Sequence, residues 1–486
     1  MMSDNTPVLV GIAQLEQRID DPAAAKEPVE LMIEAVQQAA RDAGSSELLK
    51  ATSVRVIRGI WPYQNPAKAV AEAIGNPGAQ TGITPYGGNF VQTTLNQSAL
   101  DIQNGEHDVI IITGAECGNT QAKAARAGVN LSWQPLPGTP DVSMGEEVEM
   151  RHEAEKRVRL GKPIQLYPIF ETALRHDMGL GVQEHLEHIS KLWAGFSEVA
   201  SNNPHAWIRD AKSAEDIRTP SAVNRPVSFP YPKFMNSNNN VDQGAALILC
   251  SQAKAKSLGI AKEKWIYPWA GTDAHDHYFV SNRDTLCGSP AIRLAGNRVL
   301  ELAGMTVADI DRVDVYSCFP VAVQVAAREL GLDMNKPLTV TGGLTWAGGP
   351  LNNYVMHSIA TMAELLRDAP GDKGLITANG GYLTKHAFGI YSTEPPSQGF
   401  QHNDLQADVD ALYKRDVAFE HQGEATVEGY TVMYGQTAPE QAFIAARLAD
   451  DRRVWATTDD ADVMQAMTEE EFCGRTVSIS GNLARF

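Results

Sequence analysis

The stretch DVIIITGAE, residues 108–116, is an unbroken apolar run that ends at a glycine turn. A run of this kind, without polar alternation, is typical of a strand buried on both faces of a parallel sheet. A similar unit, KGLITANGGY at residues 373–382, occurs in the second half of the chain. Two strand-plus-glycine units of the same kind indicate an internal duplication.

The first of these strands belongs to a regular alternation of strands and helices. Apolar runs at residues 7–14 and 53–61 predict two further buried strands. Apolar residues at helical spacing predict helices at residues 28–44 and 89–104, and the second of these leads into the strand at residue 108. The alternation starts again in the second half, so we expect an α/β fold with helices on both faces of each sheet.

The sequence divides into two α/β halves and a small third part. We place the N-terminal half at residues 1–255 and the C-terminal half at residues 256–395. Residues 119–235 interrupt the first half and are rich in Trp, Pro, His and Asn, which predicts a helical and loop insertion that contributes to a binding site. After a proline-rich linker, residues 405–486 contain short apolar runs separated by glycines, which predicts a small all-β domain of the barrel (OB-like) type.

The composition is that of an ordinary globular protein, with 486 residues, 43% hydrophobic and 21% charged. A formal net charge of -18 argues against a nucleic-acid partner. The five cysteines are widely spaced and form no CxxC pair, so we expect neither a disulfide framework nor a metal site. The N-terminus lacks the features of a signal peptide and no apolar run is long enough to span a bilayer, so we expect a cytoplasmic protein.

Five motifs carry a resemblance to a known family. They are DIQNGEHDVIIITGAE at 101–116, NNNVDQGAALIL at 238–249, VDVYSCFP at 313–320, GGLTWAGGP at 342–350 and ITANGGY at 376–382. In this order and spacing the chain resembles the thiolase superfamily. It is most similar to the sterol-carrier-protein-type thiolases and to thiolase-like proteins with an added C-terminal domain. The resemblance implies a duplicated five-layer α/β fold over residues 7–395, an acyl-CoA substrate and no permanently bound cofactor.

The resemblance also locates the position of the thiolase nucleophile. In the family, a cysteine at the N-terminus of a buried helix forms the acyl-enzyme, since the helix dipole lowers the pKa of a thiol there. Counting back from Gly105, the glycine at the end of that helix, places this position at Gly88. No cysteine occurs before residue 117. The covalent intermediate of the usual reaction is therefore not available.

Three other family positions differ from the thiolase pattern. The Asn- or His-led motif is replaced by Tyr316-Ser317-Cys318-Phe319, in which Cys318 matches the acid/base cysteine of the sterol-carrier type. The histidine of the Gly-His-Pro motif is replaced by Gly349, and the cysteine of the last motif by Ala378. Tyr316 matches a tyrosine that thiolase-fold retro-aldolases use in catalysis.

These comparisons define two sets of candidate site residues. The candidate catalytic residues are Cys318, Tyr316, His386 and His357. The candidate residues for binding substrate or CoA are Gly88, Asn89, Phe90, Gly349, Asn379, Gly380 and Gly381. Each also has a structural explanation, as a buried thiol, a packed tyrosine, a satisfied histidine, a capping asparagine or a turn glycine. The sequence leaves both explanations open.

Three functions fit these residues. The first is an acyltransferase-class enzyme that acts at a C–C bond of a 3-oxo or related acyl-CoA without the cysteine nucleophile. The second is a cysteine-free retro-aldol lyase on a 3-hydroxyacyl-CoA, which needs enolate stabilisation but no covalent thioester. The third is a non-catalytic acyl-CoA-binding protein. Because thiolases commonly dimerise through the edge of the central sheet, we also expect a homodimer of that type.

Overall fold

The apolar run at residues 108–116 forms strand β4 (Val109–Cys117) inside a six-stranded sheet, where every residue of the strand is buried. The strand order is β1-β8-β4-β2-β3-β5; β2 and β3 lie parallel to β4, whereas β8 is antiparallel to β4 and β1. The other members are β1 (Pro7–Glu16), β2 (Ser53–Val56), β3 (Gln80–Ile83), β5 (Val142–Ser143) and β8 (Asp242–Ser251).

The second apolar unit forms β11 (Lys373–Gly380) in a sheet of its own. This sheet has the order β10-β11-β12-β9-β13. Its other strands are β9 (Tyr267–His275), β10 (Arg312–Asp314), β12 (Lys385–Ser392) and β13 (Gln401–Asp404). Each of the two similar sequence units therefore occupies the interior of one sheet, as the duplication predicts.

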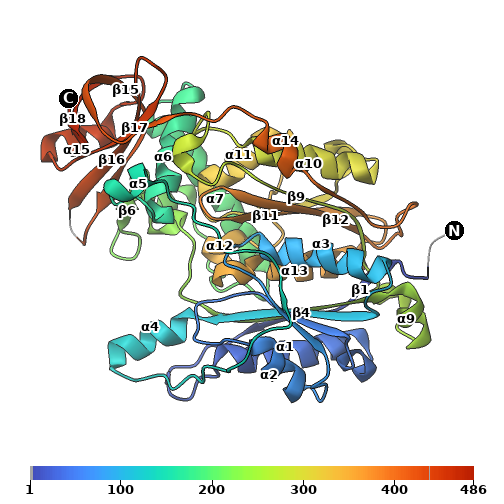
Figure 1. Ribbon diagram of the computed structural model, residues 1–486. Helices are drawn as coiled ribbons and strands as arrows, with labels where there is room; N and C mark the ends of the chain where they lie inside the picture. The colour runs from blue at the N-terminus through green and yellow to red at the C-terminus, as the bar shows by residue number, and fades with distance from the viewer. Residues whose placement is uncertain (1–3, 437) are drawn as a thin grey trace.

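The computed structural model describes residues 4–436 and 438–486 and stacks these two sheets with three helical layers (Figure 1). Helices α1 (Pro28–Ala43) and α2 (Pro66–Ala73) cover the outer face of the first sheet. Between the sheets lie α3 (Phe90–Gln103) and α13 (Tyr354–Asp368), and α10 (Pro290–Ala303) and α11 (Pro320–Leu330) cover the outside of the second sheet. The predicted five-layer α/β fold is confirmed.

The insertion consists mainly of helices, and it also contributes to the third sheet. Its helices are α4 (Gly118–Ala127), α5 (Glu153–Arg157), α6 (Pro163–Asp177), α7 (Val182–Asn202) and α8 (Ala214–Arg218). Its last strands, β6 (Pro226–Ser228) and β7 (Tyr231–Pro232), extend the sheet of the C-terminal domain, because β6 pairs with β15. Three short helices elsewhere are α9 (Gln252–Ser257), α12 (Gly343–Trp346) and α14 (Gln406–Asp410).

The C-terminal domain is a small β-barrel, as the sequence predicts. Its strands are β14 (Val417–Ala418), β15 (His421–Tyr434), β16 (Pro439–Arg447), β17 (Arg453–Thr458), β18 (Thr476–Gly481) and β19 (Leu483–Arg485). The expected range 405–486 is not entirely β, since α14 (Gln406–Asp410) lies at its start and α15 (Ala461–Glu469) lies between β17 and β18. Asp460 caps this helix through its side chain, and Met464 and Met467 bury its apolar face against the barrel.

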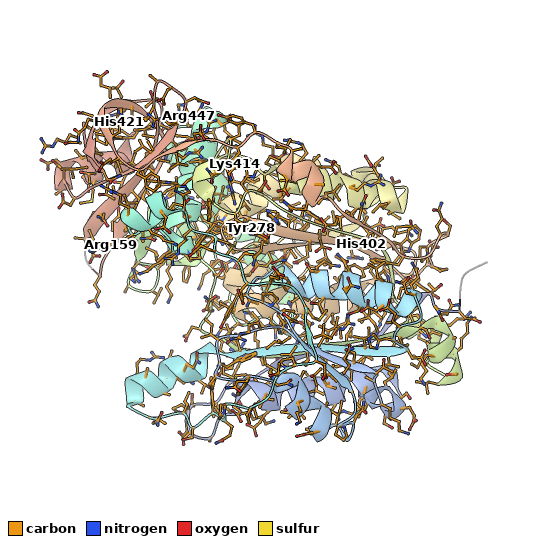
Figure 2. The ribbon with its side chains drawn as sticks, viewed as in Figure 1. Arg159, Tyr278, His402, Lys414, His421 and Arg447 are labelled. Carbon is orange, nitrogen blue, oxygen red and sulfur yellow. The ribbon has the colours of Figure 1, made fainter. Side chains whose placement is uncertain are left out.

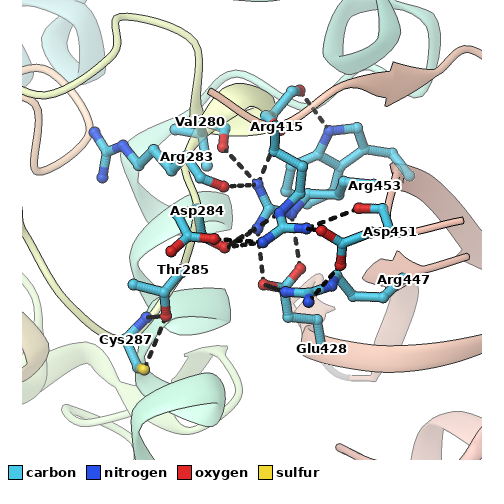
Figure 3. Close-up of polar contacts among 12 residues, drawn as sticks. Val280, Arg283, Asp284, Thr285, Cys287, Arg415, Glu428, Arg447, Asp451 and Arg453 are labelled. Carbon is cyan, nitrogen blue, oxygen red and sulfur yellow. Dashed lines mark hydrogen bonds and ion pairs between the residues drawn. The ribbon is translucent and has the colours of Figure 1, made fainter. Parts of the chain in front are cut away.

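Two buried arginines fix the barrel to the α/β core (Figure 3). Arg453 on β17 pairs with Glu428 through two hydrogen bonds of 2.7 Å and donates to the carbonyl groups of Val280, Ser281 and Arg283 in the core. Arg415 is also buried, and it donates hydrogen bonds to the backbone carbonyl and the carboxylate of Asp284 in the core. The barrel is therefore docked by charge-assisted bonds as well as by apolar packing.

The linker between core and barrel is held on the second sheet. His402 on β13, labelled in Figure 2, lies 2.9 Å from a carboxylate oxygen of Asp273 on β9. Thr93 and Asn96 on α3 donate to the same carboxylate. In the described residues, none of the helices is long and apolar enough to cross a membrane.

Candidate active site

A pocket of about 560 Å³ lies where the N-terminus of α3 meets the ends of β10 and β11. The candidate residues that line it are Gly88, Tyr316, Cys318, Asn379, Gly380 and Gly381. Residues far apart in the chain thus converge on one cavity, of a size suited to a small-molecule ligand. Its other side is closed by Tyr167 and Lys162 from the α6 region of the insertion, and by Asn239 from the turn before β8.

Gly88 lies immediately before α3, at the position that the resemblance gives to the nucleophile. A β-carbon on this residue would come within 3.0 Å of Tyr316 Oη and within 2.5 Å of the carbonyl oxygen of Asn379. Both distances are shorter than real carbon contacts allow. The tyrosine hydroxyl therefore occupies the space that a nucleophilic side chain at residue 88 would need, so a cysteine does not fit here.

The turn before α3 presents unpaired backbone donors beside the pocket. Gly87 and Gly88 line the cavity. Across the described chain, the N–H groups of Gly87, Gly88 and Asn89 donate no hydrogen bond to another protein group. Free N–H groups at the start of a helix favour an anion or a polarised carbonyl oxygen. This turn can therefore stabilise negative charge that develops on a bound thioester.

Tyr316 and Cys318 lie in the loop after β10. Burial raises the pKa of Tyr316, and it raises the pKa of Cys318 to about 12. Both groups are thus protonated at neutral pH and act as donors. Tyr316 Oη has no hydrogen-bond partner among the described residues, which leaves it free for a ligand.

A tyrosine of the insertion holds the opposite wall of the pocket. Tyr167 on α6 accepts a 3.0 Å hydrogen bond from Asn379 Nδ2 and a 2.8 Å hydrogen bond from the backbone N–H of Leu383. Asn379 Nδ2 also lies 3.7 Å from Cys318 Sγ. Sequence reasoning missed Tyr167, because a buried tyrosine on a helix has no signal that separates it from core packing.

His386 is buried behind the pocket and does not line it. It shares with Tyr316 a small internal void of about 10 Å³, which is close to the size of one water molecule. Its Nε2 lies 3.7 Å from Asp276 and 3.5 Å from Ser289 Oγ. Burial alone would raise the pKa of Asp276, but the hydrogen bond to His386 and the charge of Arg283 hold it below its ordinary value. Asp276 and Ser289 therefore hold His386 in the protein interior, outside the pocket.

The remaining candidates also lie outside the cavity lining. His357 on α13 is buried between the sheets, where its Nδ1 lies 3.1 Å from Gln14 Oε1, and burial lowers its pKa to about 4. Phe90 packs at the first turn of α3, and Gly349 lies beside Asn239, which itself lines the pocket. The geometry places Tyr316 and Cys318 on the lining of the pocket and the two histidines outside it.

Close approach explains the glycines at the end of β11. A β-carbon on Gly380 would lie 2.5 Å from Asn89 Oδ1 and 3.1 Å from the backbone nitrogen of Gly88. Gly381 has a φ of 73°, which favours glycine. Both line the pocket, so the packing of these glycines also shapes the binding surface.

Comparison with known proteins includes a solved structure that matches this chain over its whole length. A crystal structure described as a monomeric SCP2-thiolase like protein type 1 from Mycobacterium smegmatis is 32% identical, covers 100% of both chains and superposes with a TM-score of 0.84. An Ltp2-ChsH2(DUF35) aldolase shares the fold, with a TM-score of 0.61 and 19% identity over 80% of this chain and 98% of that one.

Two further comparisons concern parts of the chain. An acetyl-CoA acetyltransferase of Methanocaldococcus jannaschii is 24% identical over 240 residues, which span 49% of this chain and 53% of that protein. Residues 404–482 match the family model described as the thiolase-like protein type 1 additional C-terminal domain. Since the likeness to the Mycobacterium smegmatis protein extends over the full length at 32% identity, this chain belongs to the SCP2-thiolase-like proteins of type 1.

Proposed function

We propose that this protein is an acyl-CoA enzyme that breaks or forms a C–C bond without a covalent acyl-enzyme, as a retro-aldol lyase acting on a 3-hydroxyacyl-CoA. The observation that carries the proposal is the position of Tyr316 Oη, which fills the space beside Gly88 and has no protein partner among the described residues. A hydrogen-bonding hydroxyl stands where a thiolase needs a thiolate. That exchange suits proton transfer and enolate stabilisation, and it does not suit acyl transfer through residue 88.

The chemistry of such a lyase can be assigned to groups of this chain. The thioester oxygen binds at the N–H groups of the turn Gly87–Asn89, where negative charge is favoured. Tyr316 Oη accepts the proton of the 3-hydroxyl group as the Cα–Cβ bond breaks. The bonding electrons pass to the thioester as an enolate, and the β-carbon leaves as an aldehyde or ketone. In the same step the phenolic proton of Tyr316 passes to Cα, so Tyr316 never carries two protons and the protein ends in its initial protonation state.

A tyrosine that accepts one proton as it gives another suits the electrostatics of the pocket. Burial raises the pKa of Tyr316, which makes a stable phenolate costly. Exchange of one proton for another avoids a free phenolate. Cys318, with a pKa raised to about 12 by burial, remains a neutral donor beside it. No free CoA takes part, in contrast to thiolysis.

The test is turnover of a panel of 3-hydroxyacyl-CoA and 3-oxoacyl-CoA compounds, with and without free CoA, followed by mass spectrometry. We expect cleavage of a 3-hydroxyacyl-CoA without free CoA. Tyr316→Phe should lower kcat by at least about 100-fold, the usual contribution of general acid–base catalysis, while acyl-CoA binding persists. Cleavage that requires free CoA, or full activity of Tyr316→Phe, would contradict the proposal.

A non-catalytic acyl-CoA-binding protein is the second candidate. It is favoured by the absence, from the lining of the pocket in the described chain, of any histidine or carboxylate that could act as an ordinary general base. Saturable binding of acyl-CoA with no cleavage across the whole panel would select it.

We also infer that the protein acts as a single chain. The homologous structure from Mycobacterium smegmatis is described as monomeric. In this chain the edge of β3 is paired with β5 of the same chain, so the edge through which a thiolase-type homodimer was expected is not open.

A further inference from the structure

Lys385, the first residue of β12, lies against the turn that precedes α3. Its Nζ donates a 2.6 Å hydrogen bond to the carbonyl oxygen of Tyr86 and lies 5.0 Å from the ring centroid of Phe90. A β-carbon on Gly87 would lie 2.8 Å from this Nζ, so the ammonium directly adjoins Gly87. The side chain is only 7% exposed, and it does not line the pocket.

The bond to Tyr86 orients the next peptide group. In a trans peptide, the C=O of one residue and the N–H of the following residue point in opposite directions. Since the carbonyl of Tyr86 points at Lys385, the N–H of Gly87 points away from it. Gly87 is at the same time a wall residue of the pocket, and its N–H is free of protein partners in the described chain. Lys385 thus fixes the orientation of the Gly87 N–H group, although Lys385 itself does not line the pocket.

Lys385 is a cation without a carboxylate partner. Among the described residues, none of its neighbours forms an ion pair with it within 4.0 Å. Two titratable groups face it, Glu147 on the loop beside Tyr86 and His275 directly across on β9. Glu147 Oε1 is engaged by the N–H of Tyr86 at 2.8 Å. A buried ammonium that no acid neutralises projects its charge onto the adjacent turn.

We propose that Lys385 is a positioning cation for the turn Gly87–Asn89, and that together they form a site for an oxyanion. The chemical class of ligand is a carboxylate, or the enolate oxygen of a thioester. The inference deepens the proposed function in so far as that oxyanion belongs to an acyl-CoA, but an anion site at this turn stands without any turnover. Lys385 acts through the backbone and does not touch the ligand.

The charge of Lys385 makes this site dependent on pH. Burial lowers the pKa of Lys385 to about 8, while the charge of Glu147 opposes the shift. The lysine is cationic below that pH and neutral above it. Affinity for an anion should therefore be highest below about pH 8 and should fall as the pH rises through it.

The test uses acetate as the probe and protein labelled with ¹⁵N in glycine. Acetate titrations are followed by the amide signals of Gly87 and Gly88 at several pH values, in the wild type and in Lys385→Met and Lys385→Arg. We expect saturable shifts in the wild type that weaken above pH 8. Affinity should fall by about tenfold or more in Lys385→Met, since an opposite charge at such a distance shifts ionisation by one unit or more. Lys385→Arg should keep most of the affinity and lose the pH dependence.

The outcomes separate this inference from the proposed function. Equal acetate affinity in the wild type and Lys385→Met, or no acetate shift at Gly87 and Gly88, would overturn the inference whatever the enzyme does with acyl-CoA. Conversely, acetate binding that depends on Lys385, in a protein with no acyl-CoA cleavage, would overturn the lyase and leave the anion site in place. Thermal unfolding of Lys385→Met near the wild-type temperature shows that the variant is folded when its amides are read.

Discussion

At the scale of single residues, one exchange decides what chemistry the pocket can perform. Gly88 has no side chain, and the hydroxyl group of Tyr316 occupies the space where a side chain at residue 88 would lie. Residue 88 cannot take the cysteine of the thiolase pattern while its surroundings stay as they are. A cysteine at residue 88 would meet Tyr316 Oη on one side and the backbone of Asn379 on the other. Restoring a nucleophile here therefore requires movement of β11.

Gly88→Ala tests this packing directly. We expect it to lower the free energy of unfolding by about 1–3 kcal/mol, the usual cost of overpacking, because the added methyl group meets the backbone of Asn379 as well as the side chain of Tyr316. The measurement is the urea midpoint. Gly195→Ala is the matched control: it lies in α7 with no atom near its β-carbon position, and should stabilise the helix by about 0.5–1 kcal/mol. Equal effects of both substitutions would show that Gly88 is not tightly packed.

His357 should make the protein sensitive to mild acid. Its pKa is near 6.5 in the unfolded chain and is lowered to about 4 by burial in the folded protein. Between about pH 4 and pH 6.5, His357 is therefore protonated in the unfolded chain and neutral in the folded protein. Stability is therefore lost as the pH falls from about 6.5 to about 4. At pH 5 the loss is about 2 kcal/mol relative to pH 8.

The contribution of His357 is measured by urea unfolding of the wild type and of His357→Gln at pH 8 and at pH 5. A glutamine can keep a hydrogen bond to Gln14 and does not titrate. The wild type should lose about 2 kcal/mol more than the variant between the two pH values. The same loss in both proteins would mean that His357 is protonated in the folded state.

The sequence predicted some of the site and missed the rest for physical reasons. Gly88, Tyr316 and Cys318 could be placed because the resemblance to the thiolase superfamily gives each of them a position in, or counted from, a motif of that family. Tyr167 and Lys385 could not be placed. Their roles depend on contacts between segments hundreds of residues apart, which no local pattern encodes. For the same reason, no pattern in the sequence indicated that His386 would lie behind the pocket.

At the scale of elements, the short strand β5 changes how the first sheet ends. The insertion brings Val142 and Ser143 alongside β3, parallel to Gly82 and Ile83. Asp141 then accepts hydrogen bonds of 2.8 Å from the backbone N–H and the hydroxyl of Thr81. An edge strand that would otherwise offer unpaired groups to a second chain is covered by its own insertion.

We therefore expect the protein to sediment as a monomer over a wide range of concentration. Asp141→Ala removes the carboxylate that anchors β5, and should speed amide exchange at the ends of β3 without unfolding the core. Hydrogen exchange read by mass spectrometry on the peptide around residues 80–84 measures the change. A wild-type dimer protected along β3 would refute the role given to β5.

Elements were predictable where their apolar pattern is local and continuous. The strands β4 and β11 and the helix α3 lie close to their predicted ranges, because burial on both faces or on one face leaves a clear period in the sequence. β5, β6 and β7 have two or three residues each and owe their strand conformation to the partner they pair with. α15 follows a capping Asp460 inside a run of strands, and the pattern of strands around it concealed that signal.

At the scale of the whole molecule, the barrel is joined to the core close to the second sheet and the insertion (Figure 1). Arg453 is fully buried and links three parts at once: its own strand, Glu428 on β15 and the carbonyl groups that follow β9 in the core. A buried arginine with all its donors engaged is costly to remove, because the groups it satisfies stay buried without a partner. Cooperative unfolding of barrel and core should depend on it.

Arg453→Met is the substitution that tests this dependence. It should destabilise the docked barrel by about 3–5 kcal/mol, the cost of breaking a buried ion pair by removing one member. We expect calorimetry to show the single transition split into two, with the barrel unfolding first. Brief digestion with trypsin should then cut within residues 404–486 and leave the α/β core intact. The matched control is Arg452→Met. Its side chain is exposed and pairs with Asp450, so it should change neither measurement. If Arg453→Met also unfolds in one transition at the wild-type temperature, the apolar contacts between barrel and core suffice to hold them together, and the arginine serves only to satisfy the carbonyl groups around it.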